Sequence, residues 1–296
     1  MKGNLLQVNP QKCLQDEPVC IIIENLPPGS DIRLTVLKGH LNEMDAYKAD
    51  DDLILDSAIH ERIFLTENTK RIPVREGRIR GTLFIPEGEG SFPGVLDLFG
   101  GIGGLIEFRA AQFAARGFVS LALAYFDHED LPKDISDGRL YKWFICELTE
   151  TTQDEDQDYS SSTICLTKVK FEEADLVSTF DVAADPSTCP ECQIPIEEAD
   201  THFLLLCSKD DKSGNIEKEH DRILSILESR GKDNCELIKY EGAGHLLEPP
   251  YAPFARATFH PIFKINRLWG GNAFQHTQAS EDSWRRIQEF IRKYIN

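Results

Sequence analysis

The spacing of hydrophobic and polar positions changes along this chain and divides it into two parts. Up to about residue 70, short β-rich runs are separated by turn residues, as in residues 18–37, which surround a Pro-Pro-Gly-Ser turn. From residue 71 onward, longer apolar runs alternate with segments of helical spacing. The pattern predicts a small all-β domain over residues 1–70 and a larger α/β domain over residues 71–296.

The N-terminal part is short for the fold that its pattern favours. A β-sandwich of seven strands takes about 100 residues, and residues 1–70 offer fewer. We therefore expect an incomplete β-sandwich there.

The C-terminal part predicts two βαβ units. In the first, residues 94–99 and 118–125 are apolar runs of buried-strand type around one helix-length segment, and a hairpin turning at Gly77 precedes them. In the second, strands at residues 203–207 and 235–240 enclose a helix that Gly231 ends. A proline-rich loop follows, and then a last amphipathic helix over residues 280–295, which we expect to pack on the sheet.

One stretch interrupts this regularity. Residues 143–167 contain neither Lys nor Arg, while Asp and Glu accumulate. Such a composition predicts a solvated, poorly ordered loop. We expect an irregular acidic segment over residues 134–165.

Charge and composition exclude several classes of protein. The net charge is −18, with 32 Lys and Arg against 50 Asp and Glu, which argues against nucleic acid as a partner. No apolar run is long enough to span a bilayer, the first ten residues lack a secretory signal, and the last residues are no peroxisomal address. Eight irregularly spaced cysteines read as reduced thiols. We expect a cytoplasmic monomer without a cofactor, with mitochondria and peroxisomes as open alternatives.

Two loops that follow predicted strands carry candidate catalytic residues, because active sites of wound α/β sheets form at the carboxyl ends of the strands. Asp211 follows the strand at residues 203–207, and His245 follows the next strand on a Gly-Ala-Gly loop. This order suits a carboxylate that orients a general base. Asp210 is the reserve choice. The alternative is a pair of surface acids and an unrelated loop histidine.

A third loop is rich in glycine. Gly100 and Gly101 follow the strand at residues 94–99, and their backbone N–H groups could approach a substrate oxygen without obstruction by side chains. We interpret them as oxyanion donors, and a plain tight turn is the alternative. A dinucleotide fingerprint is excluded because Ile106 stands where its third glycine would be.

The nucleophile for such a base is unassigned. Neither Gly-x-Ser-x-Gly nor Gly-x-Cys-x-Gly occurs in the 296 residues. Ser136 has an aspartate where the first glycine belongs, and Cys146 and Cys165 lack the flanking glycines. The Cys-Pro-Glu-Cys motif at residues 189–192 has no second cysteine pair at zinc-site spacing, so we expect no metal.

Several of these segments resemble the acyl-CoA thioesterase and bile acid-CoA:amino acid N-acyltransferase family. The resemblance rests on residues 74–84, 97–110, 122–133, 203–211, 240–254 and 268–271. It implies an N-terminal β-sandwich domain, an α/β-hydrolase domain and attack on a fatty or bile acyl-CoA thioester. It also implies that Asp211 and His245 are the acid and base of a Ser/Cys-His-Asp triad.

Two departures from that family change the expectation. Its nucleophile elbow and central strand belong between residues 133 and 163, where the acidic segment stands, and its middle sandwich strands belong between residues 37 and 56. We therefore expect a truncated α/β-hydrolase domain and an acyl-CoA thioesterase with impaired catalysis. The alternatives are a non-catalytic acyl-CoA-binding protein, an unstable truncated form, an amino acid N-acyltransferase and a hydrolase of small esters.

Overall fold

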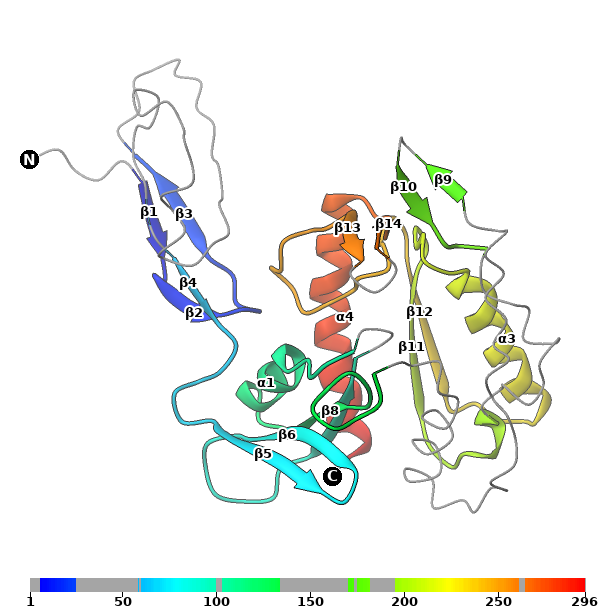
Figure 1. The fold of residues 1–296 in the computed structure, drawn as a ribbon, viewed down its shortest axis with the longest axis horizontal. Coiled ribbons are helices and arrows are strands. Elements are labelled where there is room, and N and C mark those ends of the chain that lie inside the picture. Colours follow the sequence, from blue (N-terminus) through cyan, green and yellow to red (C-terminus); the bar gives the residue numbers. More distant parts are fainter. Residues whose placement is uncertain are drawn as a thin grey trace, which may run out of the picture. The chain divides into compact units, whose positions relative to one another are not determined.

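The structure is a computed structural model, and it describes residues 6–24, 58, 60–99, 103–133, 170–172, 175–181, 195–260 and 264–295. The chain divides into two compact units, Met1–Ile63 and Phe64–Asn296 (Figure 1). The acidic segment over residues 134–165 lies outside the described residues, as does most of the predicted Pro-Pro-Gly-Ser hairpin. The domain boundary at residue 70 and the β-sandwich stay predictions.

The described part of the first unit consists of short strands. An antiparallel pair joins β1 (Leu6–Asn9) to β3 (Cys20–Ile23), and a parallel pair joins β2 (Lys12–Leu14) to β4 (Glu61–Ile63). The Arg62 guanidinium donates to the carbonyl oxygen of Gln15 at 2.9 Å. This contact ties β4 to the turn that follows β2.

The second unit begins with a four-stranded sheet in the order β5-β6-β8-β7. Its strands are β5 (Lys70–Glu76), β6 (Ile79–Ile85), β7 (Gly94–Leu98) and β8 (Val119–Ala124). β7 and β8 are parallel, and α1 (Phe108–Ala115) connects them, as the sequence predicts. The β5–β6 hairpin turns at Gly77, whose φ of 53° suits glycine.

Small side chains let α1 approach this sheet closely. Ala110, Ala111 and Ala114 form the buried face of the helix and pack against Phe84 of β6 and Ala122 of β8. The hydroxyl of Ser120 on β8 donates to the carbonyl oxygen of Ala110. The first βαβ unit is therefore closed by a core of its own.

A second parallel pair lies further along the chain. β11 (Phe203–Ser208) and β12 (Cys235–Tyr240) pair over their whole length, and α3 (Ile216–Ser229) connects them. The Asn215 side chain caps α3 by accepting from the backbone N–H of Lys218 at 3.2 Å. This is the second predicted βαβ unit.

The predicted proline-rich loop was wrong in part, because it contains two strands. β13 (Ala257–His260) and β14 (Ile265–Leu268) belong to a sheet in the order β13-β14-β10-β9, with β10 (Leu176–Ser178) and β9 (Lys170–Glu172). A short 3₁₀ helix, η6 (Ile196–Glu198), precedes β11. The two strands have four residues each, too few for a periodic signal, and β14 finds its parallel partner β10 far away in the sequence.

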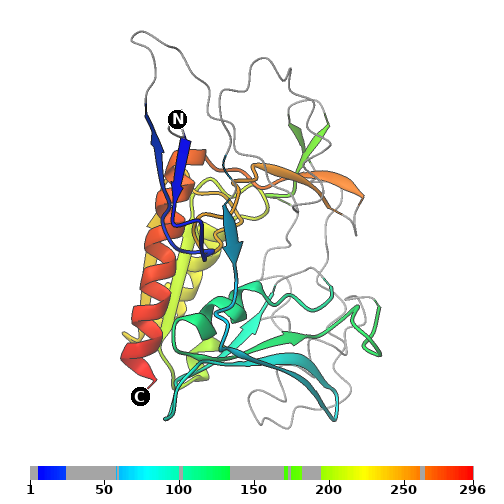
Figure 2. The same ribbon diagram turned by 90° about the vertical axis from the view of Figure 1, so that its left-hand side faces the viewer.

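The last helix, α4 (Ala273–Tyr294), begins seven residues before its predicted start at residue 280. The Asn272 side chain caps it by accepting from the N–H groups of Phe274 and Gln275 at 3.1 and 3.4 Å. Trp284 on its buried face packs against Phe113 of α1 at 4.7 Å between ring centroids. α4 also lies along β11 and β12 (Figure 2), so it packs both on α1 and on this parallel pair.

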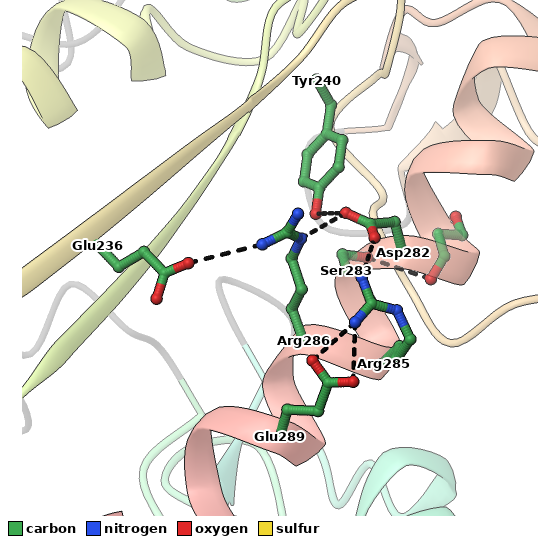
Figure 3. Close-up of polar contacts among 8 residues, drawn as sticks. Glu236, Tyr240, Asp282, Ser283, Arg285, Arg286 and Glu289 are labelled. Atoms are coloured by element: carbon green, nitrogen blue, oxygen red, sulfur yellow. Dashed lines mark hydrogen bonds and ion pairs between the residues drawn. The ribbon is translucent and has the colours of Figure 1, made fainter. Parts of the chain in front are cut away.

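Polar side chains fix α4 against β12 (Figure 3). The Tyr240 hydroxyl donates to Asp282 Oδ2 at 3.0 Å, and Arg286 Nε donates to the same oxygen at 2.6 Å. Arg286 also lies 3.6 Å from Glu236, while Arg285 binds Glu289. Because Tyr240 is the last residue of β12, this cluster fixes the point from which the next loop departs.

Parallel pairs covered by helices make this an α/β unit. Among the described strands, β7 and β11 belong to different sheets.

None of the described helices is both long and apolar enough to cross a membrane.

Candidate functional site

Asp211 and His245 stand on the turns that follow β11 and β12. Both turns leave the same edge of the parallel pair, and backbone hydrogen bonds hold them side by side. Lys209 donates to the carbonyl oxygen of Tyr240 at 3.0 Å, and Asp210 donates to that of Ala243 at 2.9 Å. The backbone hydrogen bonding between β11 and β12 therefore extends into the two turns that follow them.

The Asp211 carboxylate meets the His245 imidazole. Its Oδ2 lies 2.8 Å from His245 Nδ1, and its Oδ1 accepts from the backbone N–H groups of Ser213 and Gly214 at 2.6 and 3.2 Å. Asp211 is 5% exposed, whereas the His245 side chain is 37% exposed. A buried acid thus holds one nitrogen of a ring that solvent and ligands can reach.

Two glycines permit this close packing of backbones. A Cβ on Gly244, next to His245, would lie 2.4 Å from the carbonyl oxygen of Gly270, and a Cβ on Gly270 would lie 1.9 Å from that of Asp210. Asp211 and Gly270 also form an isolated antiparallel bridge. The segment after β14 therefore joins the acid turn and the histidine loop.

Trp269 supports the imidazole from that segment. The His245 backbone N–H donates to the Trp269 carbonyl oxygen at 2.9 Å, and the two rings stack with centroids 5.4 Å apart and planes 13° apart. Trp269 is itself 5% exposed, and its indole N–H donates to Thr258 at 2.8 Å. An anchored indole therefore fixes the plane of the His245 ring.

His276, in the first turns of α4, holds the backbone on both sides of His245. Its Nδ1 accepts from the Gly244 N–H at 3.1 Å. Burial lowers the pKa of His276, against a smaller opposing effect of its hydrogen bond with the Leu246 backbone. A neutral imidazole with Nδ1 as acceptor fits these contacts, so the tautomer is set by the loop it supports.

A buried charge cluster lies next to the histidine loop. Arg109 of α1 contacts Asp97 of β7, the Leu98 carbonyl oxygen and Glu248, three residues after His245. Burial raises the pKa of both carboxyl groups, and Arg109 opposes this in each case.

The other predicted residues fall into two groups. Asp210 does not meet the imidazole; its Oδ2 accepts from the Gly271 N–H at 2.9 Å, and Lys212 Nζ lies 3.1 Å from its Oδ1. The remaining candidates lie outside the described residues: Gly100, Gly101, Ser136, Cys146, Cys165, Cys189 and Cys192. Within the part of the chain that the structure describes, no group of three or more His, Cys, Asp or Glu side chains could hold a metal ion.

Sequence reasoning missed Arg109, Trp269 and His276. One signal could have pointed to Arg109. Its partner Asp97 is a charged residue inside the apolar run at residues 94–99, and a buried carboxylate needs a cationic or N–H partner. Trp269 lies in a segment that carries the family resemblance, but neither its role nor that of His276 can be read locally, because both depend on segments that meet only in the folded chain.

The arrangement suits proton transfer. With Nδ1 held by Asp211, Nε2 is the nitrogen that can take a proton from a nucleophile and return it to a leaving group. In such an arrangement a carboxylate can fix the tautomer of the ring and stabilise an imidazolium.

Comparison with known proteins gives consistent matches. Residues 146–296 match a family model described as "BAAT / Acyl-CoA thioester hydrolase C terminal". Acyl-coenzyme A thioesterase 1 of Mus musculus is 32% identical over 303 residues, covering 86% of this chain and 72% of that protein. Bile acid-CoA:amino acid N-acyltransferase of Mus musculus is 34% identical over 298 residues, covering 81% and 69%. Mitochondrial acyl-coenzyme A thioesterase 2 of Mus musculus is 31% identical over 303 residues, covering 86% and 67%.

Proposed function

Because the chain belongs to the family of acyl-CoA thioester hydrolases and bile acid-CoA:amino acid N-acyltransferases, we propose that its site acts on acyl-CoA thioesters, with Asp211 and His245 as the acid and base. The observation that carries this proposal is the 2.8 Å contact between Asp211 Oδ2 and His245 Nδ1 at the ends of two parallel strands. Similarity to proteins named acyl-coenzyme A thioesterases makes hydrolysis to a free fatty acid and CoA the proposed reaction.

Each residue then has a defined role. His245 Nε2 takes the proton of the attacking group and later donates it to the departing thiolate of CoA, while Asp211 stabilises the imidazolium between the two steps. The backbone N–H groups of Gly100 and Gly101 would hold the negative charge that develops on the thioester oxygen. The substrate carbonyl would lie between this glycine-rich loop and the imidazole.

We further propose that catalysis by this chain is impaired. The sequence has no Gly-x-Ser-x-Gly or Gly-x-Cys-x-Gly elbow, so the nucleophile that His245 would activate is unassigned. Loss of the nucleophile from a triad costs several orders of magnitude in rate, with residual catalysis from the oxyanion hole and binding. In the same proposal, residues 71–296 are a truncated α/β-hydrolase domain, and residues 1–70 are an incomplete β-sandwich.

The test is release of CoA thiol from palmitoyl-CoA by the purified full chain. We expect a rate far below about 1 per second, the lower end of ordinary enzyme turnover, and a further decrease in His245→Ala. His202→Ala is the matched control, since His202 is exposed, precedes β11 and stacks on Tyr294 at the end of α4. Turnover of ordinary size that His245→Ala abolishes would contradict the impairment while supporting the substrate class.

A non-catalytic acyl-CoA-binding protein is the second candidate, and the missing elbow favours it. Calorimetry with a thioether analogue of palmitoyl-CoA separates the two, because the analogue binds without reacting. Saturable binding without turnover supports the binding role, and precipitation of the chain supports an unstable truncated form.

The other candidate activities and the cellular compartment need separate tests. An amino acid such as glycine, added as acceptor, tests amino acid transfer, which the match to the N-acyltransferase favours. A short p-nitrophenyl ester tests small-ester hydrolysis. We keep a cytoplasmic monomer as the proposal. The printed name of one relative includes mitochondria, and fractionation of cells that express the chain decides between these compartments.

A further inference from the structure

Arg109 joins two parts of the molecule that carry different halves of the proposed chemistry. Its Nε donates to Asp97 Oδ1 at 3.0 Å, and one terminal nitrogen donates to the Leu98 carbonyl oxygen at 2.7 Å. The other terminal nitrogen lies 3.7 Å from Glu248 Oε2. One guanidinium thus holds the end of β7 and the histidine loop together.

The two groups that Arg109 contacts lie next to the segments that carry the proposed catalytic residues. Leu98 is the last residue of β7, and the glycine-rich loop begins two residues later. Glu248 stands three residues after His245, on the loop whose backbone Trp269 and His276 already hold from the other side. No strand pairing among the described residues links β7 to β11 or β12, so their spacing depends on the packing of α4 and on contacts between side chains such as those of Arg109.

The electrostatics make this contact more than an incidental surface ion pair. The side chains of Asp97, Glu248 and Arg109 are 7%, 20% and 24% exposed, so all three are largely removed from water. Asp97 Oδ2 and Glu248 Oε2 have no hydrogen-bond partner among the described groups. The two carboxyl groups therefore share one cation, and loss of that cation removes the largest favourable interaction of each charged form.

Arginine is the side chain suited to this task. Its planar fork can address separate acceptors at once, which the point charge of lysine cannot. The Arg109 guanidinium also lies over the Phe99 ring, 4.8 Å from its centroid. Phe99 connects β7 to the glycine-rich loop, so the guanidinium is held by the segment that it positions.

We propose that Arg109, through Asp97 and Glu248, is a positioning residue that sets the distance between the end of β7 and the loop that carries His245. The inference rests on the proposed function for its chemical meaning, since that function assigns the base to the histidine loop and the oxyanion donors to the residues that follow β7. The mechanical coupling of the loops can be measured without turnover.

Hydrogen exchange of the full chain tests the coupling in both directions. Asp97→Asn removes the charge on the β7 side, and we expect faster exchange of the His245 amide, which donates to Trp269. Glu248→Gln removes the charge on the histidine side, and we expect faster exchange of the Gly104 amide, which donates to Phe126. Each crossed effect should be about tenfold, the equivalent of one hydrogen bond to a charged group.

Three further variants complete the design. Arg109→Met should accelerate both amides, and Arg109→Lys should restore protection at one of them only. Arg80→Met is the matched control, because Arg80 also serves two carboxylates, at 2.6 Å from Asp130 and 3.7 Å from Glu129, but joins no loops of the site. It should change neither amide.

The outcomes separate the two proposals. Crossed effects support the inference; purely local effects, or equal acceleration of amides in α3 as well, overturn it. If Arg109→Met fails to fold, the Asp97→Asn and Glu248→Gln variants still decide. Crossed effects in a chain that neither binds the thioether analogue nor hydrolyses palmitoyl-CoA would refute the proposed function and leave the coupling standing.

Discussion

Replacement of Asp211 should reveal how strongly the two turns depend on one carboxylate. Asp211→Ala removes the acceptor of the Ser213 and Gly214 N–H groups and of the His245 ring. The ring is exposed enough to bind water instead, so the two backbone donors dominate the cost. An unsatisfied buried donor costs about 1–3 kcal/mol, and because these two donors are only partly buried we take the lower end and expect a loss of about 2 kcal/mol in the free energy of unfolding.

Asp211→Asn refines the same prediction. Its amide oxygen can still accept from the two backbone donors, while its NH₂ group has to face His245, so we expect about half of that loss. Urea denaturation of the full chain measures both variants through tryptophan fluorescence. Asp210→Ala is the control, because that side chain is 40% exposed and accepts from a single backbone N–H. If Asp211→Ala cost no more than Asp210→Ala, the carboxylate would not be what joins the turns.

Two further predictions concern α4. The pKa of His276 is lower in the folded chain than in the unfolded chain, so the unfolded chain binds the proton first as the pH falls; the contribution of this residue to stability is complete above pH 6.5 and is lost as the pH falls through the folded-state pKa. His276→Gln can still accept and donate hydrogen bonds, so it should reduce the acid-induced loss of unfolding free energy in urea titrations between pH 7 and pH 5. An unchanged pH profile would contradict this. Trp284→Ala removes a side chain that is 5% exposed and packs on Phe113, so we expect a loss of about 3–5 kcal/mol, whereas the exposed neighbour Phe274 should tolerate alanine with little change.

Local signals predicted the parts of the fold that depend on short-range patterns. β12 occupies the predicted residues 235–240, and both βαβ crossovers are present. Asp211 and His245 meet because both follow neighbouring parallel strands, which the sequence places in order. Strand periodicity and chain order suffice for such a site.

What the sequence could not reveal depends on partners that are distant along the chain. β14 is stable because β10 pairs with it, and α4 starts early because Asn272 caps it where the chain leaves Gly271. Arg109 and Glu248 lie in segments that carry the family resemblance, but only the folded chain reveals their contact, because it brings α1 beside the histidine loop. These features arise from tertiary contacts that override local propensity.

The position of α4 has a consequence for how the second unit responds to heat. Its Trp284 face closes the core under α1, and its Asp282 and Arg286 side chains hold β12, so a single helix contributes to the burial of both halves. Loss of the helix would therefore expose apolar surface in both places. We expect the β5-β6-β8-β7 sheet and the β11-β12 pair to unfold in one shared calorimetric transition, without a surviving fragment.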